Sequence, residues 1–217
     1  MEHETHPPII LYTDLLDNVS DVLLSLGYLF LAITSISYLW KTSGNPFTSM
    51  RNASFALGFG AIAYAHYMLR SQNYTIQAKG YYNKINESDP HIAEIIKFGN
   101  ISILCYAIIS IIQTFLSMEP DIDTAFIQKK ILSKHTFLNV PIDAYGTFLS
   151  HVLLVYAIFI DKDTNVSAPF FLLVLVMMYN TYHASYEGSS IMKNISMFGN
   201  IFIIIGYAII LGRNIIM

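Results

Sequence analysis

Six long apolar segments divide this chain of 217 residues and restrict it to a membrane-embedded helical fold. Each approaches the ~20 residues that an α-helix needs to cross ~30 Å of hydrocarbon. Only 12% of the residues are charged and 54% are hydrophobic, whereas soluble domains carry about 25% charge. We therefore expect a multi-pass integral membrane protein whose spanning helices lie at 19–40, 55–69, 92–118, 144–160, 169–186 and 191–213.

A more polar segment at 119–142 decides the number of helices. It contains acidic and basic side chains, and its apolar residues recur at every third or fourth position. This period predicts an amphipathic helix. If that helix lies on the membrane surface, the bundle has six spanning helices. If it packs inside the bundle, it is the seventh. The chain is thus an all-α polytopic bundle of seven helices, or of six if 119–142 is interfacial.

A short motif occurs twice, one hundred residues apart. Phe98-Gly99-Asn100 and Phe198-Gly199-Asn200 are each followed by an isoleucine-rich stretch and by Tyr-Ala-Ile-Ile, which starts at Tyr106 and Tyr207. We interpret this as a three-helix internal repeat within a single transmembrane domain, 1–217. The halves are 19–118 and 143–213, and 119–142 links them. A shared site is simplest to build from parallel copies, which favours seven helices.

Polar side chains within the apolar segments are candidates for a central polar site. Asparagines in mid-membrane usually have partners and face the bundle, so they either bond two helices together or form a site. The repeated motif favours the site, and a lysine one turn earlier lies on the same helical face as the first asparagine. The candidate residues are Asn100, Asn200, Lys97, Tyr67 and Tyr179.

Three histidines also lie within apolar segments, at His66, His151 and His183. Imidazoles ligate zinc, and pairs of them ligate haem. Asp143 or Glu187 would then act as the base of an intramembrane metal-dependent hydrolase. No HxxxH or HExxH spacing is present, so ordinary buried histidines are the other interpretation.

Four stretches follow the order of motifs in one family of seven-helix proteins. They are Ala61-Ile-Ala-Tyr-Ala-His-Tyr67, Lys97-Phe-Gly-Asn100 with Cys105, Tyr179-Asn180 with Glu187-Gly188, and Asn200-Ile-Phe-Ile-Ile204-Ile-Gly-Tyr207. Together they resemble the microbial (type 1) rhodopsins, retinal proteins that act as ion pumps, channels or sensors. That family's last helix reads Asp-x-x-x-Lys-x-Gly-Phe. At the position of its lysine, this chain has an isoleucine.

The departures from the rhodopsin pattern agree with one another. Ile204 stands where the resemblance places the retinal lysine, and amides stand at both counterion positions, Asn100 and Asn200. Ile101 and Val176 replace the tryptophans that would enclose retinal. A protonated imine in a low-dielectric interior needs a negative partner, so losing the amine removes the need for both carboxylates. The resemblance therefore implies a relative that does not bind retinal covalently.

These patterns predict a rhodopsin-like seven-helix membrane protein for ion or small-solute transport, or for light-independent signalling or interaction. A pair of neutral amides cannot relay protons as carboxylates do, which disfavours proton pumping. The alternatives are the metal-dependent hydrolase and a small-solute carrier built from three-helix repeats. We expect a non-enzymatic protein without a cofactor, with the lipid bilayer as its surroundings. A homo-oligomer is compatible with the sequence, and a net charge of −3 gives no argument for nucleic acid.

Overall fold

A computed structural model describes residues 8–41, 46–71, 90–115, 136–137, 140–159, 167–185 and 190–216. Within these ranges the chain is all-helical, apart from one hairpin of two-residue strands. The helices are α1 (Pro8–Lys41), α2 (Pro46–Ser71), α4 (Pro90–Phe115), α6 (Ile142–Phe159), α7 (Ser167–Ser185) and α8 (Ile191–Ile216). The strands β1 (Thr136–Phe137) and β2 (Val140–Pro141) pair antiparallel immediately before α6.

The first three described helices begin at prolines, Pro8, Pro46 and Pro90. Proline suits the first helical position because its fixed backbone angle matches the helix and its missing N–H has no partner there. As a result α1 and α2 begin well before the apolar segments predicted at 19–40 and 55–69. The apolar segment marks the part of each helix that suits lipid, and the helix itself continues beyond it.

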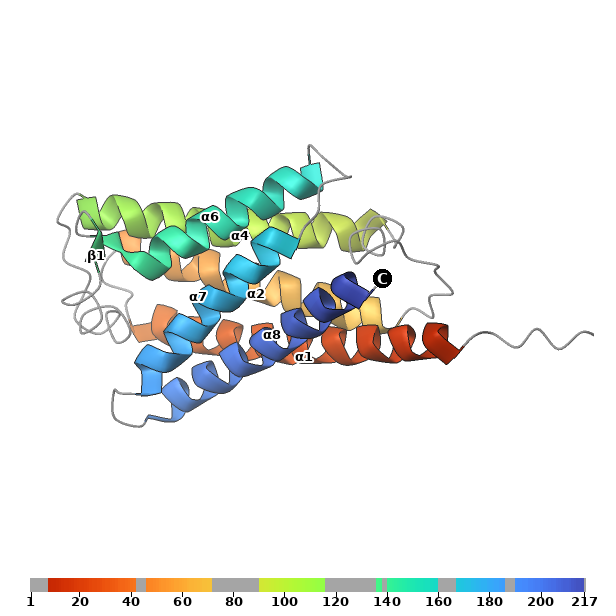
Figure 1. The fold of residues 1–217 in the computed structure, drawn as a ribbon. Coiled ribbons are helices and arrows are strands. Elements are labelled where there is room, and N and C mark those ends of the chain that lie inside the picture. The colour runs from red at the N-terminus through yellow and green to blue at the C-terminus, as the bar shows by residue number, and fades with distance from the viewer. Residues whose placement is uncertain are drawn as a thin grey trace, which may run out of the picture.

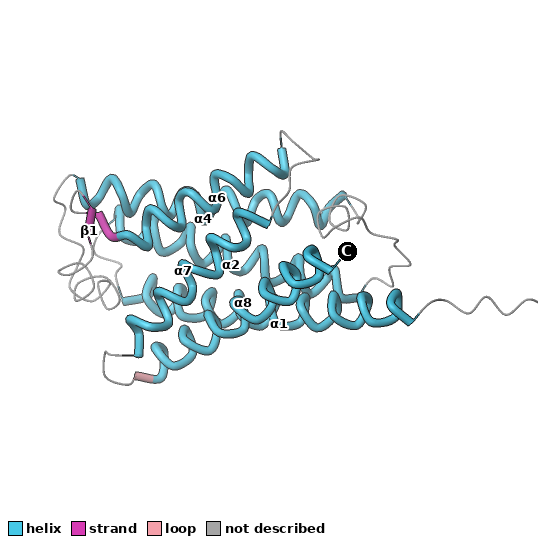
Figure 2. The backbone as a smooth tube through the Cα atoms, in the orientation of Figure 1, coloured by secondary structure: helices cyan, strands magenta, loops and turns pink. Residues whose placement is uncertain are grey.

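The six described helices form a ring in chain order, shown in Figure 1. Each helix packs against the next, and α8 returns to pack against α1. Neighbouring helices run in opposite directions (Figure 1). We call the end of the bundle where α1 begins and α2 ends end A, and the other end, where α1 ends and α2 begins, end B. The smooth backbone trace in Figure 2 shows the same arrangement.

The position of the link between α4 and α6 bears on the number of helices. Helix α4 ends at end B, and α6 begins there beside the β1–β2 hairpin (Figure 1). Residues 116–135 lie outside the described residues, so a seventh helix is not confirmed. The end of the segment predicted as a helix at 119–142 instead contains the β1–β2 hairpin. The described helices α4 and α8 run in opposite directions, and a repeat of parallel copies is not confirmed either.

The outer surface of the described bundle is apolar and its interior is partly polar. Three helices contain stretches long and apolar enough to cross a membrane, Leu15–Trp40, Pro90–Gln113 and Ile191–Gly212. Helices α6 and α7 contain shorter apolar stretches, Tyr145–Tyr156 and Ala168–Tyr182. Every described helix exposes large apolar side chains, for example Ile36, Leu57, Ile112, Leu149, Leu175 and Ile205. This distribution suits a protein surrounded by lipid, in which apolar side chains face outward.

Two close helix crossings explain the repeated Phe-Gly-Asn motif. A Cβ atom added to Gly199 of α8 would lie 2.9 Å from the carbonyl oxygen of Gly27 in α1. A Cβ added to Gly99 of α4 would lie 3.1 Å from the carbonyl oxygen of Gly58 in α2. Small residues allow two helix backbones to approach this closely in membranes. Each motif therefore supplies a glycine crossing, one between α8 and α1 and one between α4 and α2.

The other two residues of each motif have equivalent places in the two helices. Phe98 and Phe198 point outward, with 53% and 51% of their surfaces exposed. The following asparagines are buried. One turn after each glycine, Ile103 and Ile203 pack onto Gly58 and Gly27 of the facing helix. The motif thus serves helix packing in both places.

Candidate functional site

A buried ion pair joins α1 to α2 near end A. Nδ1 of His66 lies 3.0 Å from Oδ1 of Asp21, and the two side chains are only 4% and 0% exposed. The residues of α1 that face this region recur at every third or fourth position, so they share one side of the helix. They are Asp17, Ser20, Asp21, Leu24 and Tyr28, all buried.

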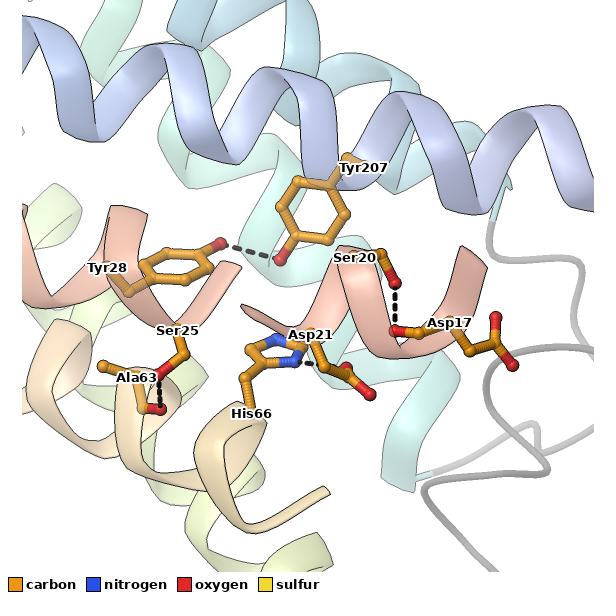
Figure 3. Close-up of polar contacts among 8 residues, drawn as sticks. All are labelled: Asp17, Ser20, Asp21, Ser25, Tyr28, Ala63, His66 and Tyr207. Atoms are coloured by element: carbon orange, nitrogen blue, oxygen red, sulfur yellow. Dashed lines mark hydrogen bonds and ion pairs between the residues drawn. The ribbon is translucent and has the colours of Figure 1, made fainter. Parts of the chain in front are cut away.

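Hydroxyl groups bond to the helices around this pair, as Figure 3 shows. Ser25 of α1 donates to the Ala63 carbonyl of α2 over 2.9 Å, which fastens the two helices beside the pair. Ser20 donates to the carbonyl of Asp17, 2.8 Å away in the preceding turn. The backbone is therefore held on both sides of Asp21.

Tyr28 connects the ion pair to α8. Its ring is nearly parallel to the His66 ring, with 6.2 Å between centroids and 3° between planes. Its hydroxyl lies 2.7 Å from the hydroxyl of Tyr207 (Figure 3). The site therefore contains a carboxylate, an imidazole and two phenols from three helices, α1, α2 and α8.

Burial makes the Asp21–His66 pair chemically notable. Ionisable groups inside membrane bundles are costly, usually pair with one another, and often mark ion or proton pathways. A carboxylate bonded to an imidazole can take up and release a proton, and histidine is the side chain best suited to do so near neutral pH. The pair also fastens α1 to α2, but Ser25 and the apolar contacts of these helices already do that.

A second polar cluster lies near end B. Nη1 of Arg51 in α2 donates to Oε1 of Gln113 in α4 over 3.2 Å. Nε2 of Gln113 donates to Oγ1 of Thr48, also over 3.2 Å. Lys193, near the start of α8, is buried at the same end. Among the described side chains, the buried acids therefore lie at end A, and the buried arginine and lysine lie at end B.

The five residues predicted to form a central polar site occupy different environments. The Asn100 amide donates to the Ile96 carbonyl of its own helix, 2.8 Å away. Asn200 is buried in α8, and no described hydrogen bond joins the two amides. Tyr67 points outward with 56% of its surface exposed. Lys97 bonds to the exposed carboxylate of Glu94, 2.6 Å away.

Tyr179, the fifth of these residues, is half-buried in α7. The described contacts therefore do not assemble these five residues into one site. Asn100 is bonded within its own helix, Tyr67 points outward, and Lys97 is bonded to Glu94 of its own helix. The repeated asparagines are better explained by the packing of the two glycine crossings.

The histidines predicted as metal ligands also have separate partners. His66 is paired with Asp21, whereas Nδ1 of His151 in α6 lies 2.8 Å from the Thr147 carbonyl. The side chain of His183 lies outside the described residues, as do those of Asp143 and Glu187. In the part of the chain that can be described, no group of three histidine, cysteine or acidic side chains is placed to hold a metal ion. The hydrolase interpretation remains a prediction.

The positions that carry the rhodopsin resemblance lie in ordinary helix packing. Ile204, at the position of the missing lysine, packs against the apolar core. Val176 is buried in α7, whereas Ile101 is 40% exposed on the outside of α4. No protein-family model, curated protein or solved structure matches the chain. The resemblance therefore remains a prediction.

The sequence contained a signal for the site that the motifs did not reveal. Asp21 is an acidic residue inside the segment predicted to span the membrane at 19–40, and Asp17 lies one turn before it. An acid at such a position is itself a reason to expect a buried partner. The partner, His66, was predicted only as a possible metal ligand, because sequence spacing does not show which residues of α1 and α2 face each other.

Proposed function

We propose that this protein is a multi-pass membrane transport protein that conducts protons through the Asp21–His66 pair. The observation that carries the proposal is the burial of this carboxylate–imidazole pair, 0% and 4% exposed, inside a bundle with an apolar exterior. Such pairs form proton relays in pumps and transporters. In this proposal all six described helices cross the bilayer, in keeping with their alternating directions (Figure 1).

The distribution of buried charge supports a directional path. Asp17 and Asp21 lie at end A, and Arg51 lies at end B. Acidic side chains raise the local concentration of cations, including protons, and basic side chains lower it. End A is therefore the proposed side from which a proton reaches the pair.

The sequence-based prediction against proton pumping concerns only the two asparagines. It holds for Asn100 and Asn200, because neutral amides do not exchange protons at ordinary pH. It does not apply to Asp21 and His66, which carry a carboxyl and an imidazole group and lie on other helices. The proposal keeps the predicted class of ion transport but replaces the predicted site, which draws on α2, α4, α7 and α8, with a pair that joins α1 to α2.

Proton flux into liposomes tests the proposal. The purified protein is reconstituted into vesicles containing a pH-sensitive dye, and a potassium gradient with valinomycin drives proton entry. We expect protein-dependent acidification, and at least a tenfold loss of its rate in Asp21→Asn and in His66→Gln. Glu94→Gln is the matched control, because it removes an exposed acid from α4, and it should retain the wild-type rate.

Circular dichroism and size-exclusion chromatography of each variant establish that lost flux does not reflect unfolding. The proposal fails if wild-type vesicles acidify no faster than empty ones. It fails equally if folded Asp21→Asn protein conducts protons as the wild type does.

A further inference from the structure

A continuous chain of aromatic rings crosses the bundle next to the proposed proton site. It runs from α4 through α2, α1 and α8 to α7, and consecutive centroids are 3.9, 3.9, 5.6, 6.4 and 4.7 Å apart. We call it the aromatic layer. Its members, in order, are Tyr106, Phe55, Phe59, Tyr28, Tyr207 and Phe170.

The aromatic layer lies between the two polar regions of the interior. On α1 and α2 the layer is at the level of the two glycine crossings, because Tyr28 and Phe59 directly follow Gly27 and Gly58. On α8 it lies beyond the crossing, where Gly206, next to Tyr207, faces Ser20 and Leu24 of α1. Asp21 lies two turns before Tyr28 on α1 and His66 two turns after Phe59 on α2, so the pair is on the end A side of these rings. Arg51 lies one turn before Phe55 on α2, on the end B side. Phe59 and Phe170 are buried, at 1% and 3% exposure. Tightly packed rings exclude water, and a proton needs water or a titratable group to move further.

Within the layer, the Tyr28–Tyr207 hydrogen bond is the contact nearest the proton site. The bond joins α1 to α8, and the Tyr28 ring is parallel to the His66 ring. The Tyr207 ring stacks on Phe170 of α7, with 27° between the planes. Breaking the bond between the two hydroxyls would therefore involve a movement of α8 away from α1 beside the His66 imidazole.

We propose that the Tyr28–Tyr207 pair is the gate that controls passage of a proton from Asp21–His66 toward end B. This inference rests on the proposed function. With the 2.7 Å bond formed, the aromatic layer is closed. When the bond breaks, water enters between α1 and α8 and connects the His66 region to the polar cluster of Arg51, Gln113 and Thr48.

The glycine crossing between α1 and α8 supplies the pivot for this motion. Tyr207 is eight residues beyond Gly199 on α8, a distance of about 12 Å along a helix at 1.5 Å per residue. A tilt of roughly 10° at the Gly27–Gly199 contact would therefore move Tyr207 by about 2 Å, enough to break a hydrogen bond of this length.

Removing one hydroxyl while keeping the ring tests the gate in the same liposome assay. We expect Tyr207→Phe and Tyr28→Phe each to raise proton flux about fivefold, the change in an equilibrium that the loss of one hydrogen bond typically causes. Tyr64→Phe is the control, because its side chain is 52% exposed on the outside of α2, and its flux should equal that of the wild type. Adding Asp21→Asn to Tyr207→Phe should abolish the extra flux.

The outcomes separate the gate from the proposed function. If Asp21→Asn abolishes flux but both tyrosine variants conduct as the wild type does, the gate is refuted and proton conduction stands. If the tyrosine variants conduct less, the hydroxyls carry the proton and do not block it, which also refutes the gate. If flux in wild-type and Asp21→Asn vesicles is the same, the proposed function fails first.

Discussion

Helices α4 and α8 contain the same Phe-Gly-Asn motif, yet among the described hydrogen bonds only one from α8 reaches Tyr28, whose ring lies beside the ion pair. Both motifs place a glycine against a glycine carbonyl of the facing helix, at 3.1 Å for Gly99 and 2.9 Å for Gly199 from an added Cβ. Beyond the crossing, Tyr207 of α8 bonds to Tyr28, whereas Tyr106 of α4 stacks on an apolar ring in α2. The Phe-Gly-Asn residues therefore provide packing in both helices, and the ionisable pair Asp21–His66 lies on other helices, α1 and α2.

Two acidic residues, Asp21 on the α1–α8 side and Glu94 on the α2–α4 side, differ in burial. Asp21 lies on α1, the partner of α8, and is completely buried against His66. Glu94 lies on α4 and is 68% exposed beside Lys97 of its own helix. A buried charge depends on its partner, whereas an exposed charge is solvated whether or not a partner is present. Equivalent variants of the two acids should therefore have very different effects.

The largest effect should come from Asp21. Asp21→Asn should lower the free energy of unfolding by about 3 kcal/mol, because removing one member of a buried ion pair leaves the other without compensation. The measurement is reversible unfolding in mixed detergent micelles. His66→Gln combined with Asp21→Asn should cost less than the sum of the two single variants, because their side chains are in contact. Additive costs would show that the two side chains do not stabilise each other.

The sequence was sufficient to predict the class of fold. Apolar length and low charge predicted helices at all six places where the structure describes them, because spanning lipid requires about twenty apolar residues whatever the neighbours are. The repeated Phe-Gly-Asn motif was also recognised correctly as a feature common to two helices. Its role was harder to predict, since a buried glycine and asparagine suit both a packing contact and a binding site.

The pairing of helices could not be predicted from spacing alone. His66 and Asp21 are 45 positions apart in the chain and meet only because α1 and α2 pack antiparallel in one register. Tyr67 is the residue next to His66, but it points outward, since a helix turns by about 100° per residue. A prediction that depends on which side of a helix faces inward needs the neighbouring helices, and these are set by tertiary packing.

An intermediate effect should come from the glycine crossings, where α4 and α8 are expected to behave alike. Gly99→Ala and Gly199→Ala should each cost roughly 1–3 kcal/mol of stability, because the new methyl group meets a backbone carbonyl that has little room to move. Gly60→Ala is the matched control in α2, because no atom lies within 4 Å of its added Cβ. It should stabilise the protein by up to about 1 kcal/mol through helix propensity. A loss of stability in only one of the two glycine variants would show that the two motifs do not have the same packing role.

The smallest effect should come from the exposed pair on α4. Glu94→Gln should change the free energy of unfolding by less than about 0.5 kcal/mol, and the change should shrink further at high salt, because solvent already screens the Glu94–Lys97 contact. The same micelle unfolding experiment at low and high salt measures it. A loss above about 1 kcal/mol that persists in salt would mean that Lys97 depends on Glu94 in a buried environment. Lys97 would then belong to the interior, as the central polar site predicted from the sequence requires, and the contrast between α4 and α8 would be lost.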